Sequence, residues 1–353
     1  MTGMAKAISA PFKKGVNFTI WLEYGSVEQN HADMFTKKDF ENAKSLGCDV
    51  IRIPIHFEKF CSEADGYQIP KFLLDVLDNV AAWTEELGMY AIFDFHNRTD
   101  VDSFTATDVE RILNPVWTQL AKRYRDRSDY LIYELMNEPH GIEIPVWNGI
   151  IERLHKLVRS IDDKHYIIVG GADWNSFTGM RALPEFRDDK VIYTFHFYDP
   201  HTFTHQGAPW CHMERVRGIP FPYDPDRMPP MPENPTDVER KCFEEYPAKG
   251  TLEEVEKFFD EYVSFSLERK APIYCGEFGC SAACVDPAER VRWYEIVTKL
   301  LEERGISRSN WDYYGGFGIF NVKPGKMFAK PAFPEDLNLE LLKAMGLTIP
   351  TGK

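Results

Sequence analysis

Two glutamates stand where a purely structural acidic side chain is not expected, each at the end of a short apolar run. Glu138 belongs to an Asn-Glu-Pro triplet after LIYELM, and Glu277 belongs to a Gly-Glu-Phe triplet after PIYC. One such glutamate is as often part of a rim salt bridge as of a functional site, but two in matching positions favour a functional explanation. Paired carboxyl groups can divide the work of proton donor and nucleophile.

Other polar or aromatic residues also follow apolar runs. They are Arg52, His96, Asn137, His196, Tyr198 and Trp311. Cleavage of a glycosidic bond needs such a set: an acid for the leaving oxygen, a carboxylate nucleophile, and donors that strengthen as positive charge develops at the sugar carbon. The residue types therefore favour this chemistry, although a histidine at a strand end can be an ordinary hydrogen-bonded residue and Trp311 can be core packing.

The elements that would position these residues are short β-rich runs alternating with helical patterns. Strands are predicted at 15–20, 49–55, 90–96, 131–137, 166–171, 191–197, 272–278 and 306–311. Eight parallel strands close a (β/α)8 TIM barrel, an α/β fold in which the strand ends meet at one face. We therefore expect residues 1–353 to form a single catalytic barrel domain.

Amphipathic helices are predicted between the strands. The run 70–87 repeats apolar residues at helical spacing, and Gly88 ends it. Similar patterns occupy 108–125, 145–161, 251–269 and 286–304. The segment 205–250 breaks this rhythm with many prolines, so we interpret it as an insertion after strand six, either a long loop or a subdomain. Because the loops after barrel strands open on the active face, we expect it to wall the substrate cleft.

Composition excludes several classes of partner. The net charge of −14 would repel nucleic acid. Seven cysteines contain no C-x-x-C pair, so neither a disulfide framework nor a zinc site is indicated, and we expect no metal and no cofactor. The sequence contains no apolar stretch of 18 residues, so no membrane span is predicted. We expect a monomer that is cytoplasmic as given, or secreted if a signal peptide is missing from the sequence.

A metal hydrolase is a rival interpretation because four histidines fall close together in the chain. They are His196, His201, His205 and His212. Metal ligands on a helix or strand usually stand at i, i+2 or i, i+4 with a carboxylate nearby. We expect Pro200 and Pro209 to interrupt any regular element here, which argues against a catalytic metal.

The segments RIP, DFHN, NEP, HFY, GEFG and WDYYGGFGIF, in this order, resemble glycoside hydrolase family 5 over nearly the whole chain. The run FHFYDPHTFTHQGAPW, with the insertion behind it, is similar to bacterial endoglucanases of the clostridial type-C cellulase kind. The resemblance implies an endo-acting, retaining β-glucanase that hydrolyses β-1,4-glucosidic bonds in cellulose-type and mixed-linkage β-1,3-1,4-glucans.

The same resemblance assigns roles to the strand-end residues. It implies that Glu138 is the acid/base and Glu277 the nucleophile, with carboxyls about 5 Å apart. Arg52 and Tyr198 would hold Glu277 ionised, while the nearby negative charge would help Glu138 to keep its proton. Among the remaining substrate-binding residues, Asn137 would bond the sugar 2-hydroxyl, His96 and His196 would orient hydroxyls and carboxylates, and Trp311 would form a platform, with Trp21, Trp174 and Trp210 as further platforms.

Two features of the strands do not fit simply. Arg308 lies in a strand more polar than a buried one should be, and Glu134, within the fourth strand, is expected to point away from Glu138 and serve a structural role. The resemblance also leaves open a β-mannanase or glucomannanase, or an exo-β-1,3-glucanase, on the same barrel. A non-catalytic carbohydrate-binding barrel is less favoured because the whole polar set is present.

Overall fold

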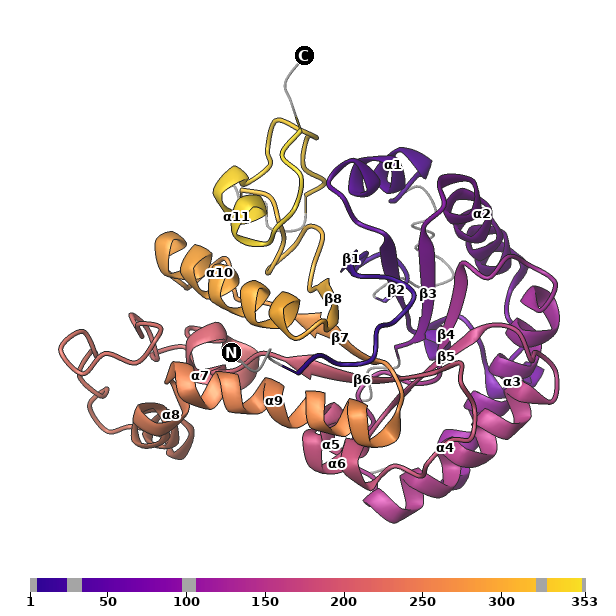
Figure 1. The fold of residues 1–353 in the computed structure, drawn as a ribbon, viewed down its shortest axis with the longest axis horizontal. Helices are drawn as coiled ribbons and strands as arrows, with labels where there is room; N and C mark the ends of the chain where they lie inside the picture. Colours follow the sequence, from indigo (N-terminus) through magenta and orange to yellow (C-terminus); the bar gives the residue numbers. More distant parts are fainter. Residues whose placement is uncertain (1–4, 24–33, 97–105, 322–328, 351–353) are drawn as a thin grey trace.

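The computed structural model describes residues 5–23, 34–96, 106–321 and 329–350. Eight parallel strands in chain order close into a barrel, with the long helices packed outside it (Figure 1). The strands are β1 (Lys14–Asn17), β2 (Val50–Ile55), β3 (Tyr90–Phe95), β4 (Leu131–Glu134), β5 (Tyr166–Gly170), β6 (Val191–Phe197), β7 (Ile273–Phe278) and β8 (Ser307–Asn310). The predicted (β/α)8 barrel is confirmed.

The helices of the outer layer begin and end close to the predicted bounds. The long ones are α2 (Lys71–Leu87), α3 (Ala106–Tyr124), α4 (Ile144–Arg159), α9 (Leu252–Arg269) and α10 (Pro287–Glu303). Gly88 ends α2 with φ of 61°, a left-handed conformation that glycine adopts without strain. The shorter helices are α1 (Lys37–Ser45), α5 (Ala172–Asn175), α6 (Phe177–Ala182), α7 (His201–Thr204), α8 (Asp237–Lys249) and α11 (Leu339–Ala344), with single 3-10 turns η1 (Phe57–Lys59), η2 (Glu63–Asp65) and η3 (Pro209–Cys211).

The barrel interior is built in layers because side chains on a strand alternate between its two faces. An apolar layer joins Phe12 to residues of six strands, Val50, Ile92, Ile132, Ile168, Ile192 and Tyr274. Two residues further along three of these strands come Arg52, Asp94 and Glu134, all fully buried. The period of two therefore places a charged layer directly beyond the apolar one, toward the carboxyl ends of the strands.

A bulge in β7 turns a further charged residue, Glu277, inward. The register of β6 and β7 pairs Phe195 with Cys275 but His196 with Glu277, which leaves Gly276 as an extra residue. An inserted residue re-aims the side chains that follow it. A Cβ at Gly276 would also lie 2.8 Å from Oγ1 of Thr194 and 3.2 Å from Nε2 of His196, so the glycine makes room beside Glu277.

The long connection between β6 and β7 holds α7, η3, α8 and α9. In Figure 1 its irregular part and α8 extend to one side of the barrel, next to α7 and α9. Val216, Ile219 and Phe221 are buried, so this part has its own apolar contacts with the domain. The expectation that Pro200 and Pro209 would interrupt any regular element was wrong: α7 forms between them, because a proline before the first turn has no N–H that the helix needs.

None of the helices in the described ranges combines the length and the apolar character that a membrane crossing requires.

Candidate active site

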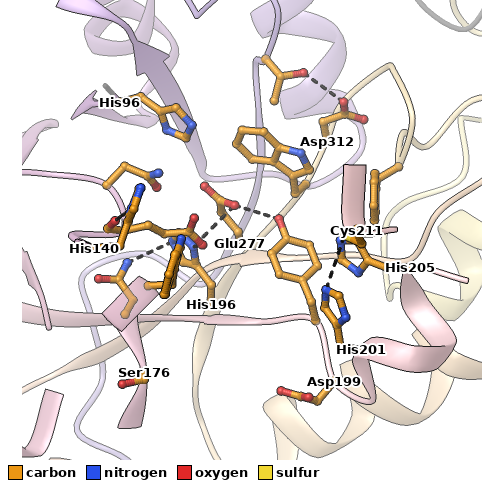
Figure 2. Close-up of a pocket in the computed structure, with 18 of the residues that line it drawn as sticks. His96, His140, Ser176, His196, Asp199, His201, His205, Cys211, Glu277 and Asp312 are labelled. Carbon is orange, nitrogen blue, oxygen red and sulfur yellow. Dashed lines mark hydrogen bonds and ion pairs between the residues drawn. The ribbon is translucent and has the colours of Figure 1, made fainter. Parts of the chain in front are cut away.

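A cleft of about 940 Å³ opens where the carboxyl ends of the strands meet, and Figure 2 shows its lining side chains. Nine of the residues singled out from the sequence line it. They are His96, Asn137, Glu138, Trp174, His196, Tyr198, Trp210, Glu277 and Trp311. The positions predicted from strand ends therefore converge on one site.

Glu138 and Glu277 face each other across His196. One carboxylate oxygen of each glutamate lies within 4.8 Å of the other. Nδ1 of His196 is 2.5 Å from Oε1 of Glu138 and 3.5 Å from Oε2 of Glu277. Burial lowers the pKa of His196 to about 4, so its ring is neutral near pH 7. The amide Nδ2 of Asn175 lies 3.5 Å from Nε2, which favours the tautomer that donates from Nδ1 to Glu138.

Glu277 is held by two donors from neighbouring strands. Nη1 of Arg52 donates to Oε1 at 2.7 Å, and the hydroxyl of Tyr198 donates to Oε2 at 2.8 Å. Burial and the nearby Glu277 carboxylate raise the pKa of Tyr198 well above its ordinary value, so the phenol keeps its proton and stays a donor. Both oxygens of Glu277 are thus held in place by donated hydrogen bonds.

Arg52 is fully buried and is absent from the residues that line the cleft. Its place among the substrate-binding residues needs correction, because it reaches the site only through other side chains. Its Nε and Nη2 donate to both oxygens of Glu134 at 2.7 and 2.9 Å, and Nη2 also lies 2.9 Å from Oδ2 of Asp94. Burial would lower the pKa of Arg52, but Asp94, Glu134 and Glu277 together raise it well above the ordinary value.

Glu134 points into the barrel, where its buried ion pair fits the structural role expected of it. Its carboxylate forms a bidentate pair with Arg52 and is fully buried. Burial raises the pKa of Glu134 and raises that of Asp94 to about 8, in each case against the pull of Arg52. One guanidinium therefore binds both acidic groups of the layer beneath Glu277.

Asn137 and Glu138 follow β4 on a loop that both neighbouring strands hold. The N–H of Leu135 donates to Ile168 at 3.1 Å and that of Asn137 donates to Phe95 at 2.9 Å. Oδ1 of Asn137 accepts from Nη2 of Arg52 at 2.8 Å, so its amide N–H groups are the donors it retains. Glu138 has a φ of 35°, a left-handed conformation that a residue with a Cβ adopts only when its surroundings enforce it.

His96 and Trp311 form a stacked pair in the wall beside Glu277. Their ring centroids are 5.4 Å apart with an interplanar angle of 13°. Nδ1 of His96 is 2.6 Å from Oδ2 of Asp94, and Nε2 is 3.9 Å from Oε1 of Glu23. Burial lowers the pKa of His96 to about 4, so this histidine is also neutral near pH 7.

Two exposed tryptophans extend the apolar surface of the cleft. Trp174 is 56% exposed and stacks on His140 at 4.8 Å and 7°, while Nδ1 of that histidine bonds the backbone oxygen of Glu138 at 2.7 Å. Trp210, on η3, is 63% exposed. Trp21 is different: it is 1% exposed and packs against Phe35 at 5.3 Å, so its prediction as a platform was wrong.

The cleft also contains residues that the sequence had not singled out for it. They include Glu23, His140, Asn175, His205 and Asp312. Glu23 follows an apolar run after β1, which is the same sequence signal that pointed to Glu138. Asn175 lies with Asp173 and Trp174 in a left-handed turn, and this turn has no sequence signature. Arg308 points away from the site, where its Nη2 donates to Glu302 at 2.7 Å.

Comparison with known proteins agrees with this geometry. The family model described as cellulase, glycosyl hydrolase family 5, matches residues 14–316. Endoglucanase C of Acetivibrio thermocellus is 28% identical over 323 residues, covering 88% of this chain and 94% of that protein. The crystal structure of endoglucanase Cel5A from Thermotoga maritima superposes with a TM-score of 0.77 at 26% identity, over 94% of this chain and 96% of that one. The chain therefore belongs to the cellulase family, glycosyl hydrolase family 5, and is a glycoside hydrolase.

Proposed function

We propose that this protein is an endo-acting, retaining β-glucanase that hydrolyses β-1,4-glucosidic bonds in cellulose-type and mixed-linkage β-1,3-1,4-glucans. The observation that carries the proposal is the pair of carboxyl groups, Glu138 and Glu277, with oxygens within 4.8 Å of each other across an open cleft. Retaining glycosidases have carboxyls about 5–5.5 Å apart, whereas inverting enzymes need room for a water between them.

In the first step Glu277 attacks the anomeric carbon while the glycosidic C–O bond breaks. Glu138 gives its proton to the departing oxygen, and a glycosyl ester of inverted configuration forms on Glu277. Arg52 and Tyr198 hold the attacking carboxylate in place through hydrogen bonds of 2.7 and 2.8 Å. Neutral His196 donates from Nδ1 to Glu138 and so orients the acid toward the same bond.

In the second step Glu138 acts as a base. It takes a proton from water as the water oxygen attacks the anomeric carbon, and the ester bond to Glu277 breaks. Two inversions return the β configuration to the product. Both carboxyl groups regain their starting protonation, so the cycle closes without a metal or cofactor in its chemistry.

The rest of the cleft would bind the glucan chain. Asn137 supplies amide N–H donors close to Glu138, suited to the 2-hydroxyl, and Trp311 supplies an apolar face next to Glu277. Trp174 and Trp210 offer further faces on separate loops. Several platforms in an open cleft suit binding along the interior of a chain, which supports endo action. All these residues come from one polypeptide, so we propose that the monomer is active.

The names of the relatives favour glucan as substrate, while one observation keeps mannan as a second candidate. The Thermotoga maritima enzyme, 26% identical, has been solved with cellobiose and also with mannotriose. A manno-oligosaccharide differs from glucan at the 2-position, where Asn137 would act. We therefore propose glucan as the preferred substrate and mannan as the secondary one.

The test is a panel of carboxymethylcellulose, mixed-linkage β-glucan, glucomannan, mannan and β-1,3-glucan, assayed for reducing ends and viscosity. We expect the highest kcat/KM on the β-1,4-containing glucans, with viscosity falling early relative to reducing ends. Faster hydrolysis of pure mannan or β-1,3-glucan would overturn the substrate assignment. Proton NMR during early turnover should show the β-anomer of the product first. Full activity in Glu277→Gln would contradict the proposed mechanism.

A further inference from the structure

We propose that His201, His205 and Cys211 form a binding site for a thiophilic divalent cation of the Zn²⁺ type in the wall of the cleft. One donor atom from each residue lies within 4.8 Å of the other two. Figure 2 shows the three side chains close together, to the right of Glu277 and His196. The site uses none of the residues that would carry out hydrolysis.

The two histidines are aligned by a single helical turn. His201 is the first residue of α7 and His205 is its C-cap, four residues later, and the N–H of His205 donates to the backbone oxygen of His201 at 3.0 Å. Residues at this spacing lie on the same side of a helix. Their rings are stacked, with centroids 4.2 Å apart and an angle of 14°, so both can turn a nitrogen toward one ion.

Hydrogen bonds also set the tautomer of His205. The hydroxyl of Thr204 donates to the backbone oxygen of Tyr198, so this hydroxyl is available to His205 only as an acceptor. Nδ1 of His205 lies 3.0 Å from the same hydroxyl oxygen and therefore carries the proton. Nε2 is left with its lone pair, as in metal-binding histidines whose other nitrogen donates to an oxygen.

Cys211 completes the donor set from the neighbouring turn η3. Its Sγ lies 3.9 Å from Nε2 of His201. The turn is closed by two bonds to the backbone oxygen of Ala208, from Cys211 at 3.3 Å and from Met213 at 3.0 Å. Burial, together with the nearby Cys242, raises the pKa of Cys211 to about 11, so an incoming cation would replace the thiol proton and release it to solvent.

Two imidazole nitrogens and a thiolate sulfur are a typical partial coordination set for Zn²⁺, with water as the fourth ligand. Glu138, His196 and Glu277 bring a second set of donor atoms within 4.8 Å, but that set contains no sulfur. A sulfur-dependent signal therefore distinguishes the two places. A bound ion would tie α7 to η3, which carries Trp210, and so fasten two parts of the β6–β7 connection to each other.

The experiment uses the full chain with Co²⁺ as a spectroscopic probe and Zn²⁺ as a calorimetric one. We expect one equivalent of Co²⁺ to give a thiolate charge-transfer band in the near ultraviolet and tetrahedral bands in the visible. Cys211→Ser should abolish the charge-transfer band and weaken Zn²⁺ binding at least about tenfold, since even outer-shell changes cost that much. Zn²⁺ should raise the Tm of the unmodified protein and not that of Cys211→Ser.

Matched controls lie in the same segment. Cys242→Ser removes a half-buried thiol, and His212→Asn removes an exposed imidazole. Both variants should keep the Co²⁺ charge-transfer band and the affinity for Zn²⁺. His201→Asn changes an exposed position and should weaken Zn²⁺ binding as Cys211→Ser does. It replaces Cys211→Ser in the test if Cys211→Ser fails to fold. The proposal is overturned if the band survives in Cys211→Ser, or if Zn²⁺ binding depends on Glu277 and not on Cys211.

Discussion

Nη1 of Arg52 lies 2.7 Å from Oε1 of Glu277, inside a barrel layer where the guanidinium has no contact with solvent. The same guanidinium binds Glu134, so the position of Glu277, the proposed nucleophile, depends on a residue that substrate cannot reach. An ion pair of this kind is costly to break, because removing one partner leaves an uncompensated charge in a dry environment. The attack that we propose for Glu277 depends on this ion pair.

The role of Glu134 can be tested with Glu134→Gln. A glutamine can accept only one of the two hydrogen bonds from Arg52, and its NH2 group would face the guanidinium. We expect kcat to fall about tenfold, corresponding to about 1.4 kcal/mol, while KM changes less than about twofold. Glu152→Gln, which alters an exposed pair with Lys156 on α4, is the control and should leave both parameters unchanged. An effect confined to KM would contradict a positioning role.

The barrel and its charged layer were predictable to different degrees. Apolar strands and amphipathic helices leave periodic signals, so the eight strands and the long helices could be placed from sequence. The inward direction of Glu134 could not be predicted from the sequence. The strand β4 is buried on both faces and shows no alternation of apolar and polar residues that would identify its inner side. The bulge at Gly276, which turns Glu277 inward, depends on pairing with β6 and has no local signature.

The proposed acid role of Glu138 predicts that the effect of its removal depends on the leaving group. Glu138→Gln should lower kcat/KM for cellotetraose about 10³-fold, since the alkoxide leaving group needs a proton. A dinitrophenyl β-cellobioside should lose much less in the first step because its leaving group departs without protonation. Stopped-flow release of the phenolate would show a burst followed by slow turnover. Equal losses on both substrates would argue against Glu138 as the acid.

The exposed tryptophans should contribute to binding of long chains. Trp174→Ala removes an aromatic face that stacks on His140, and we expect KM for cellohexaose to rise about tenfold, or about 1.4 kcal/mol. Hydrolysis of a short aryl cellobioside should change less. Val146→Ala, at an exposed position on the outer helix α4, is a neutral control. If both substrates were affected equally, Trp174 would have a structural role.

Which tryptophans are exposed in the cleft could not be predicted from the sequence. Trp21 and Trp174 both follow barrel strands, yet Trp21 is enclosed by Phe35 and its neighbours while Trp174 is carried outward by a left-handed turn. Exposure of a loop residue depends on packing between segments far apart in the chain. The two glutamates at strand ends were easier to place in the cleft, because a charged residue directly after an apolar strand is an uncommon sequence feature.

The neutral state of His96 predicts a pH dependence of stability. Its pKa is lowered from 6.5 to about 4 in the folded protein, mainly by burial, so the unfolded chain binds a proton first as pH falls. Its contribution to stability is therefore full above pH 6.5 and is lost as pH falls toward 4. In His96→Asn, the slope of the unfolding free energy against pH between 6 and 4.5 should be shallower by about 1.4 kcal/mol per pH unit. Exposed His212→Asn should retain the slope of the unmodified protein; an unchanged slope in His96→Asn would mean that His96 does not titrate in this range.

The nucleophile role proposed for Glu277 can be tested by trapping the covalent intermediate. In a dinitrophenyl 2-deoxy-2-fluoro-β-cellobioside the fluorine slows both steps of hydrolysis. The good leaving group still allows the first step to proceed, so the glycosyl ester accumulates. Mass spectrometry of the digested protein should find one cellobiosyl group on the peptide that contains Glu277, and none in Glu277→Gln. A label on Glu138, or release of α-product without any labelled peptide, would contradict the assignment of Glu277 as the nucleophile.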